Sequence, residues 1–556
     1  MKILLAGQWL FCALLLLLLG IATLRLITIA IKEDKPDPIP LWSLWALGTA
    51  ALTAILLVTH FFLPINSYLI PVGMAAFYAA VDRRFVAFVL KQQAAAIRQI
   101  HWIIILVFFV VLTQILFYSF NPMTTYDTWL YHDQALKWNE QYSIVPGLGN
   151  LHTRLAYPST FFLTNALFDN NTTYVFSSFL YIFLLCLGSG GLNRVLRRQI
   201  DVLSVAQSLS LIALPVFIRD LPSLSNDIGG GIFYIAAMAL ISMAETQKSP
   251  ARKIMALWVS LYAITVKLTF LPLGLYGLYL LYDDLKNKKY FTALFAYGLP
   301  VVSLYIPFLI RNVIVSGYLI YPFRYVDFFN VEWKIPLRTL VSDSQWIASW
   351  ARVPGLSPQE VLGQGFMHWF LPWISVDYNM VFVMLFVFCS LVFFVSFLVL
   401  KTDRATDFPI ACLISLISVL FWFMTAPDIR FGFSIMLVFG SFSIAPLLCR
   451  LIKSISEHKW SLPVVVSVFC LSISIGSLYC AGKKPKMQTV AELNQLVKEH
   501  QEEAFVIKIV EENITFYKPL YKNWCMTSPL PCTPYDTPPL QFKMRGESIK
   551  QGFNPS

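Results

Sequence analysis

Charged residues are scarce in this sequence, and the scarcity excludes an ordinary soluble protein. Of 556 residues, 13% are charged and 57% are hydrophobic, whereas soluble domains carry about 25% charged residues. Such long apolar runs with so little charge indicate that lipid solvates most of the surface. The net charge is +11, but no long basic patch with interleaved aromatic residues is present, which argues against nucleic-acid binding.

Two further absences narrow the function. The sequence has no glycine-rich loop of the kind that holds a nucleotide phosphate. It also has no disulfide framework, because seven of its nine cysteines, from Cys12 to Cys480, lie within or at the ends of apolar runs. The first apolar run, 4–31, is too long for a signal-peptide core and lacks a clear cleavage site, so we expect a retained helix.

The apolar runs predict an all-α polytopic membrane protein with about 14 spans, since a helix needs about 20 apolar residues to cross a bilayer. The run 254–282 is interrupted near Lys267 and Pro272, so we expect two short helices that meet inside the membrane. Pro158–Phe168 is too short to cross and is expected at the interface. The other runs are 4–31, 41–63, 65–81, 101–119, 173–191, 203–218, 228–243, 290–310, 379–400, 408–424, 431–449 and 462–480.

Basic residues predict the orientation, because lysine and arginine concentrate in cytoplasmic loops. They alternate correctly from loop to loop after residue 82, and the N-terminus is expected outside. We divide the chain into N-terminal membrane helices (1–100), a membrane domain (101–480) and an extracytoplasmic tail (481–556). The expected outer segments are 119–157, 219–227, 311–378, 425–430 and the tail.

The first outer segment carries residues suited to chemistry. Asp127 follows a spanning helix by a few residues, and His132 and Asp133 come about a turn and a half later. A carboxylate at that position can take a proton from a hydroxyl, as a general base does, although Asp127 could instead cap a short helix. His152 and Arg154 add donors for a phosphate or for sugar hydroxyls, unless they belong to an ordinary surface loop.

Further charged residues fall near the same face. Asp227 begins a helix before three glycines, either as a cap or as a second, catalytic acidic group. Lys267 interrupts a span, where a cation costs about 2.5–3.5 kcal/mol, so we expect it to face an outer cavity; the alternative is snorkelling. Arg430 lies at a helix junction, where a local pair with Asp428 is the simpler interpretation.

The segment 311–378 is rich in aromatic residues. Leu337, Leu340 and Trp350 mark an amphipathic helix suited to lying on the membrane. With Arg311 and Arg352, the aromatic residues suit the binding of a sugar and a lipid phosphate. Interfacial anchoring alone would explain most of them.

The sequence of the tail, 481–556, predicts a small structured segment outside the membrane. Val490–Val497 has an apolar helical face, and Phe505–Val510 reads as a strand. So small a segment gains from a covalent staple, and disulfides persist in oxidising outer compartments. We therefore predict a Cys525–Cys532 disulfide that holds a loop over the outer face, the alternative being two free thiols.

A set of motifs resembles a group of bacterial membrane proteins related to the GT-C glycosyltransferases, which include protein mannosyltransferases and lipid A aminoarabinose transferases. The resemblance runs from about residue 100 to the end of the chain. The motifs are Tyr126-Asp127, Leu130-Tyr-His132, Gly147 to Arg154, the Ser-Asn-Asp227 helix start, Lys267, Arg311-Asn, Gly317-Tyr and Trp350-Ala-Arg352.

The resemblance implies a GT-C-like helical membrane domain with a catalytic acidic residue in the first outer loop, a position that Asp127 matches. It implies a polyprenyl-phosphate sugar donor, a lipid or glycan acceptor, and inversion at the anomeric carbon. Tyr126 stands where the usual motif has a second acid, so the use of Mg²⁺ or Mn²⁺ stays open. The candidates to neutralise the departing phosphate are Arg154, Lys267, Arg311 and Arg430.

Two other functions stay open. A transporter or flippase for a lipid-linked saccharide would fit Lys267 and the broken helix, although no inverted repeat is evident. An outer-face polysaccharide polymerase or ligase would use a lipid-diphosphate donor and would need Asp127 less. A one-sided cavity with lateral lipid access favours transfer, whereas two alternating openings favour transport.

Overall fold

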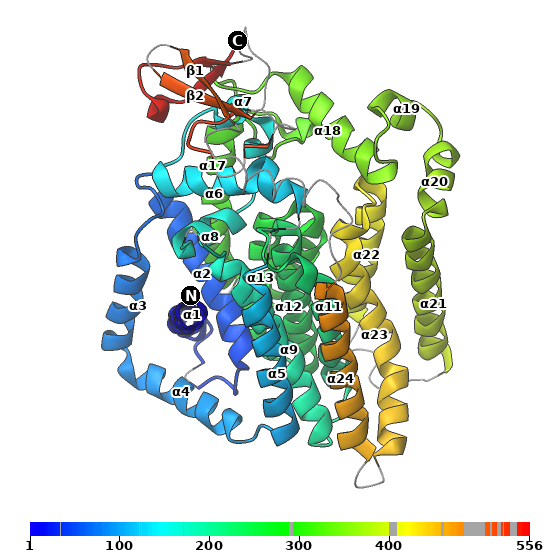
Figure 1. Cartoon of the computed structure of the whole chain (residues 1–556). Coiled ribbons are helices and arrows are strands. Elements are labelled where there is room, and N and C mark those ends of the chain that lie inside the picture. Colours follow the sequence, from blue (N-terminus) through cyan, green and yellow to red (C-terminus); the bar gives the residue numbers. More distant parts are fainter. Residues whose placement is uncertain are drawn as a thin grey trace.

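The protein, in a computed structural model, is a helical bundle with a small sheet-containing tail at one end (Figure 1). Among the described residues, nine helices are long and apolar enough to cross a membrane, or up to ten if one bent pair is counted as a span. A mostly helical architecture with many membrane-length helices is therefore confirmed. The structure describes residues 1–33, 35–121, 123, 125–170, 172–288, 293–399, 409–456, 461–482, 506–511, 514–519, 524–525, 528–533 and 542–556.

The two N-terminal helices cross at a pair of glycines. In α1 (Lys2–Ala30) and α2 (Leu41–His60), a Cβ on Gly20 or Gly48 would overlap a backbone carbonyl of the other helix. Glycine has no Cβ, so only glycine allows the two backbones to come this close.

The centre of the bundle consists of helices that are buried around their whole circumference, as expected for helices that are apolar on every side. In both α9 (Val175–Leu196) and α12 (Asn226–Gln247), 89% of the most apolar 18-residue stretch is buried. Beside them stand α13 (Pro250–Val266) and α23 (Ile429–Ile455), as Figure 1 shows.

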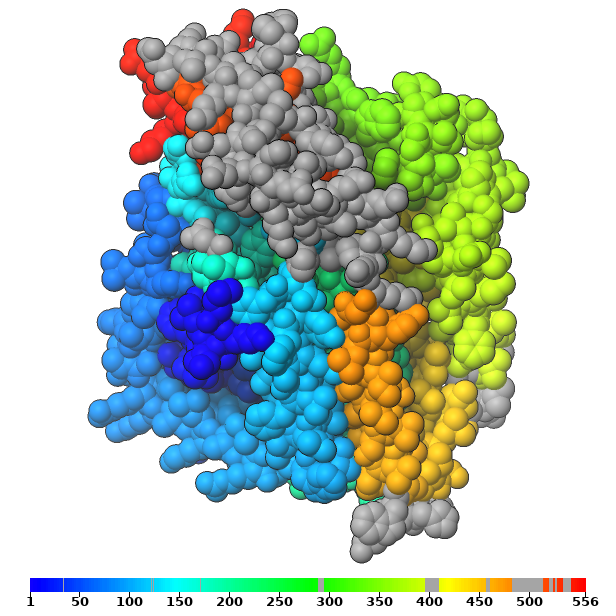
Figure 2. Space-filling model, viewed as in Figure 1, coloured from blue at the N-terminus to red at the C-terminus, as the bar shows by residue number. Residues whose placement is uncertain are grey.

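The outer helices expose apolar side chains over a wide surface. Figure 2 shows one such face, with α5 (Trp102–Tyr118) beside α24 (Ser461–Gly482). Surfaces of this extent are unusual in water-facing proteins and suit contact with lipid. The exposed side chains on these two helices include Leu106, Phe109, Phe117, Val468, Leu471 and Ile475.

The nine or ten membrane-length helices among the described residues are fewer than the predicted 14, because several apolar runs form short or broken helices. The run 65–81 forms α3 (Leu69–Val81), only 13 residues long, and 408–424 forms α22 (Pro409–Thr425), 17 residues long. The short helix α8 (Phe161–Phe168) is buried along its entire length, whereas an interfacial position was predicted.

The helix break predicted near Lys267 is present. After α13, Lys267 has an extended backbone (φ −153°, ψ 127°), and a 3₁₀ segment, η5 (Leu268–Leu273), leads into α14 (Gly274–Lys286). Pro272 within η5 has no N–H to donate and cannot continue a regular helix. The break therefore positions Lys267 at the junction of two helical segments.

The remaining elements connect and cover these helices. They are α4 (Arg83–Ile97), η1 (Thr128–His132), α6 (Asp133–Gln141), α7 (Leu148–Leu151), η2 (Thr153–Ala156), α10 (Val202–Leu209), η3 (Ser210–Ile212), α11 (Ala213–Phe217), η4 (Ile218–Asp220), η6 (Ala293–Tyr297), α16 (Gly298–Pro300), η7 (Val301–Tyr305), α17 (Ile306–Ser316), η8 (Arg324–Val326), α18 (Leu337–Arg352), α19 (Pro358–Leu362), α20 (Phe366–Ser375) and α21 (Asp377–Val399).

The segments 119–157 and 311–378 pack together at one end of the bundle, which we call the loop end (upper in Figure 1). The Gly147 N–H donates to the Ile314 carbonyl at 2.8 Å, and Asn150 Nδ2 donates to the Trp333 carbonyl at 2.8 Å. Gly147 has φ +65°, a conformation that favours glycine. The predicted amphipathic helix is α18, although Leu337 and Trp350 on its apolar face are exposed.

The described part of the tail forms two antiparallel strand pairs on the loop end. β1 (Val506–Glu511) pairs with β2 (Ile514–Pro519), and β3 (Phe542–Met544) pairs with β4 (Phe553–Pro555), separated by η10 (Ile549–Gln551). The predicted strand 505–510 corresponds to β1. The helix predicted at Val490–Val497 lies outside the described residues.

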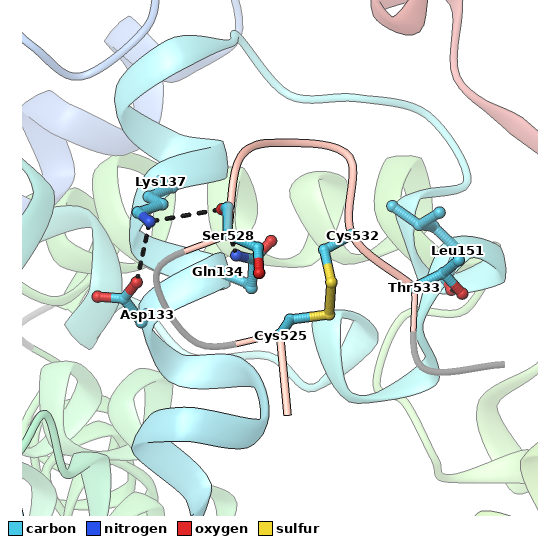
Figure 3. The surroundings of a disulfide bond; sticks show 8 residues. All are labelled: Asp133, Gln134, Lys137, Leu151, Cys525, Ser528, Cys532 and Thr533. Carbon is cyan, nitrogen blue, oxygen red and sulfur yellow. Dashed lines mark hydrogen bonds and ion pairs between the residues drawn. A yellow bond between two sulfur atoms is a disulfide. The ribbon is translucent and has the colours of Figure 1, made fainter. Parts of the chain in front are cut away.

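The Cys525–Cys532 disulfide is present, with its Cα atoms 5.9 Å apart. Figure 3 shows the bonded loop between two parts of the first outer segment. On one side, Gln134 Nε2 donates to the Ser528 carbonyl at 3.0 Å; on the other, Thr533 Oγ1 donates to the Leu151 carbonyl at 3.0 Å. The disulfide therefore holds a loop that bridges α6 and α7.

Candidate functional site

Four charged residues from distant parts of the chain form a continuous series of ion pairs at the loop end. Arg430 Nη1 donates to Asp127 Oδ2 at 2.7 Å, and Arg430 Nε donates to Asp227 Oδ2 at 3.0 Å. Lys267 Nζ donates to the other oxygen of Asp227. One guanidinium thus joins two carboxylates, and Asp227 serves two cations. We call these four residues the charge cluster.

Helix starts position two members of the cluster. Ser225 caps α12 by accepting the Ile228 N–H, so Asp227 occupies the first turn and is not the cap. A carboxylate is favourable there because the helix dipole is positive at its N-terminus. Asp428 caps α23 by accepting the Arg430 backbone N–H at 2.8 Å. The Arg430 side chain is therefore left to reach Asp127 and Asp227, and the local Asp428–Arg430 side-chain pair does not form.

Lys267 reaches the cluster because its backbone is extended between α13 and η5. Its ammonium lies 3.6 Å from the centroid of the Phe431 ring, a cation–π contact in addition to its pair with Asp227. Its side chain is only 16% exposed, and that of Asp227 is 8% exposed. The cation that interrupts the apolar run is therefore buried with a partner, as intramembrane cations require.

Asp127 precedes η1, and its carboxylate makes no capping hydrogen bond, so the capping interpretation is wrong. Burial alone would raise the pKa of Asp127. The positive charge of Arg430 is the largest of the contributions that outweigh burial and lower that pKa below its usual value. Asp127 is therefore an ionised, cation-paired carboxylate at neutral pH.

Tyr131 and Arg154 lie beside the cluster. Arg154 Nη1 donates to the Tyr157 hydroxyl at 3.0 Å, and the Tyr157 hydroxyl donates to Asp343 at 3.4 Å. Burial lowers the pKa of Arg154, but the nearby Tyr157, Tyr131, Asp343 and Asp127 raise that pKa by more than burial lowers it, so the guanidinium stays charged. The sequence motif contains Tyr131, but nothing in the sequence indicates that it interacts with both Asp127 and Arg154.

Only one of the two ring nitrogens of His132 forms a hydrogen bond within the described residues. Its Nδ1 donates to the Leu224 carbonyl, which leaves the lone pair on Nε2, and Nε2 has no hydrogen-bond partner within the described residues. Burial lowers the pKa of His132 more than Asp127 and Asp227 raise it. The ring is thus a neutral imidazole held between the first outer segment and the approach to α12.

The tail contributes an aromatic group next to Asp127 that sequence reasoning missed. The ring of Trp524, adjacent to the disulfide, lies 5.4 Å from Tyr126 and 5.2 Å from Trp129, measured between centroids. Trp524 and Trp129 are buried, whereas Tyr126 is 40% exposed. The disulfide-bonded loop therefore packs against the residues that flank Asp127.

Four other predicted site residues contact different partners. Asp133 pairs with Lys137 at 3.3 Å and accepts from Tyr174. Arg352 donates to the carbonyls of Met424 and Thr425 at the end of α22.

Arg311 donates to Asn139 Oδ1 at 3.2 Å. His152 is buried 6.4 Å from the Tyr131 ring, and burial, followed by the charge of Arg154, lowers its pKa to about 3. These residues support the surroundings of the charge cluster and are not part of it.

A divalent metal ion does not fit the cluster as it stands. Asp127 and Asp227 already pair with Arg430 and Lys267, so these two cations neutralise the carboxylates that a metal ion would otherwise bind. Across the described residues, no group of three or more carboxylate, imidazole or thiolate side chains converges as a metal site.

Comparison with known proteins identifies the family. The sequence model described as a domain of unknown function, DUF8201, matches residues 1–437. The chain belongs to this family, and the match includes Asp127, Asp227, Lys267 and Arg430 but not the tail. Searches of curated proteins and of solved structures found no match.

Proposed function

We propose that the protein is an inverting glycosyltransferase with a GT-C-like helical domain. It would move a sugar from a polyprenyl-phosphate donor to a lipid or glycan acceptor at the outer face of a bacterial cytoplasmic membrane. The charge cluster carries the proposal. It combines a carboxylate that can take a proton with two cations that can stabilise a phosphate, at one end of a bundle of apolar helices.

The proposed reaction is a single displacement. The acceptor hydroxyl gives its proton to Asp127 while its oxygen forms a bond to the anomeric carbon. The bond between that carbon and the phosphate oxygen breaks, and its electron pair leaves with polyprenyl phosphate. The departing group gains one negative charge, which Arg430 and Lys267 are placed to stabilise.

Two independent features support an outward-facing site. α12 and α23 both begin at the charge cluster, and their far ends carry Lys248, Arg450 and Lys453, residues typical of cytoplasmic loops. The disulfide lies at the loop end, which suits an oxidising compartment. Both features support an outward-facing loop end.

Transport of a lipid-linked saccharide is the second candidate, because discontinuous helices with a charged residue at the break are common in transporters. The break at Lys267 favours it. The two functions differ in product. A transferase cleaves the bond between sugar and phosphate, whereas a transporter moves the intact donor across the bilayer.

The test is donor cleavage by purified protein in liposomes. A panel of polyprenyl-phosphate sugars is supplied with an extract of cell-envelope lipids and glycans, and released polyprenyl phosphate is measured by mass spectrometry. We expect one donor to be consumed, and Asp127→Asn to slow its consumption by about 10²–10⁴-fold. Asp327→Asn, which removes a carboxylate paired with Lys334 at the same end, is the control and should retain activity. Movement of intact donor without cleavage would favour the transporter.

A further inference from the structure

The charge cluster is neutral as it stands, with two carboxylates and two cations. Both cations expected to meet a lipid phosphate are therefore already occupied. A phosphate can bind Arg430 or Lys267 strongly only if it competes with a carboxylate, so binding of the donor must rearrange the ion pairs.

Arg430 is the member that an incoming ligand can reach. Its side chain is 42% exposed, whereas those of Asp127, Lys267 and Asp227 are 22%, 16% and 8% exposed. Its Nη2 makes no hydrogen bond within the described residues, so both N–H donors of that nitrogen are unused. A guanidinium that presents adjacent N–H groups matches a phosphate in bidentate geometry.

The two carboxylates that bind the Arg430 guanidinium are fixed to different degrees. Asp227 binds Nε from a buried position, and its second oxygen is fixed by Lys267. The Arg430 backbone is held by Asp428. Asp127 binds only Nη1, at the more exposed end of the group. A small rotation of the guanidinium would break the bond to Asp127 while Asp227 keeps its hold.

The bond to Arg430 makes Asp127 a weak base in this arrangement, because a cation bound to a carboxylate disfavours its protonation. We propose that Arg430 is exchanged from Asp127 to the phosphate of the lipid-linked donor, so that donor binding unmasks Asp127 as the base. The exchange rests on the proposed function. It makes the order of events obligatory, because an acceptor that arrives first meets a masked carboxylate.

The exchange also balances charge during transfer. Asp127 goes from −1 to 0 as it takes the acceptor proton, and the phosphate gains one negative charge as the bond to the sugar breaks. Arg430 then has less attraction to Asp127 and more to the leaving group. Proton uptake and departure of the phosphate are thus coupled through one side chain.

The test measures the reactivity of Asp127 toward a carbodiimide, which labels protonated, unpaired carboxyl groups. Full-length protein in detergent is labelled alone, with a polyprenyl phosphate, with the matching polyprenol, or with inorganic phosphate, and the Asp127 peptide is quantified by mass spectrometry. Native mass spectrometry confirms that the lipid is bound. Polyprenyl phosphate should raise labelling about tenfold or more, the effect of losing one cationic neighbour, and polyprenol should not.

Arg430→Gln provides the second readout, because its Asp127 should be labelled strongly without ligand and should not respond to polyprenyl phosphate. Inorganic phosphate alone raising the labelling would support the exchange and show that the lipid chain is dispensable. Unchanged or reduced labelling with bound polyprenyl phosphate would overturn it, as would failure of polyprenyl phosphate to bind. Donor cleavage without unmasking would refute the exchange and keep the proposed function, whereas unmasking without cleavage of any donor would do the reverse.

Discussion

Arg430 and Arg311 show how differently one residue type can be used at the same end of the bundle. Arg430 lies between two carboxylates and is 42% exposed. Arg311, on α17, is 9% exposed; its side chain has one hydrogen bond, to the neutral amide of Asn139, and its Nε has no partner among the described residues. A charge that is neutralised and reachable suits a ligand, whereas a charge sealed among neutral groups suits a structural position.

The neighbours of Arg311 reinforce the contrast. His60 Nε2 binds the Tyr142 carbonyl, while His60 Nδ1 and Asn139 Nδ2 have no hydrogen-bond partner in the described parts of the chain. The Arg311 region is thus a buried polar contact between α2, α6 and α17, and no described carboxylate pairs with its charge. We expect it to tolerate the loss of its charge better than the charge cluster does.

The largest expected effect separates the two arginines in catalysis. Arg430→Gln should lower donor cleavage by about 10²–10³-fold, the usual cost of removing one group that stabilises developing charge. Arg311→Gln should stay within about tenfold, because no contact joins it to the cluster. Initial rates at saturating donor make the comparison. Equal losses in the two variants would remove the distinction between the two regions.

The next effect concerns stability. Asp227→Asn leaves Lys267 buried without its carboxylate, and breaking a buried pair in this way costs about 3–5 kcal/mol. Arg311→Met strands no carboxylate and should cost less than about 1 kcal/mol or stabilise the protein. Thermal unfolding in detergent gives both values. A larger loss for Arg311→Met than for Asp227→Asn would contradict this account.

The disulfide tests how firmly the tail supports the site. Cys525→Ser should release the loop that places Trp524 against Tyr126 and Trp129, at a cost of about 2–3 kcal/mol to the folded tail. We expect faster proteolysis of the tail and a smaller loss of transfer than for Arg430→Gln. Cys480→Ser, which changes a free cysteine in α24, is the matched control. Equal proteolysis of the two variants would mean that the disulfide does not secure the loop.

The smallest effect contrasts two carboxyl groups of the first outer segment. Arg430 helps to lower the pKa of Asp127, whereas burial, followed by Asp169 and Asp133, raises the pKa of Glu140 from 4.5 to about 8. The folded state therefore favours protonated Glu140, and stability falls as pH rises from 4.5 to about 8. Glu140→Gln should flatten that part of the profile of melting temperature against pH. An unchanged slope would refute the assignment.

The sequence predicted the members of the charge cluster better than their partners. Asp127, Asp227 and Lys267 stand out because each interrupts or borders an apolar run, where a charge is costly and is usually paired or functional. For Arg430 the sequence favours a local pair with Asp428, and only the capped start of α23 shows that Asp428 accepts from the backbone instead. Local patterns find such residues, but their contacts depend on how separate helices pack.

The same limit explains what was missed. Asp133 is placed at the site by its closeness to Asp127 in the sequence, yet it pairs with Lys137, because neighbouring residues on a helix point in different directions. Arg311 is placed there by the motif resemblance, yet it donates to Asn139. The predicted span count exceeds the number of membrane-length helices among the described residues because apolar runs such as 65–81 and 408–424 form helices of only 13 and 17 residues, which hydropathy alone does not reveal. The contact of Trp524 with Tyr126 joins residues almost 400 positions apart.

The most direct test of the account is an experimental structure with a bound polyprenyl phosphate. The account predicts that the phosphate lies between Arg430 and Lys267, that Arg430 no longer contacts Asp127, and that the lipid leaves the loop end toward the apolar surface. A phosphate held by Arg311, or one bound while the contact between Arg430 and Asp127 stays intact, would contradict it.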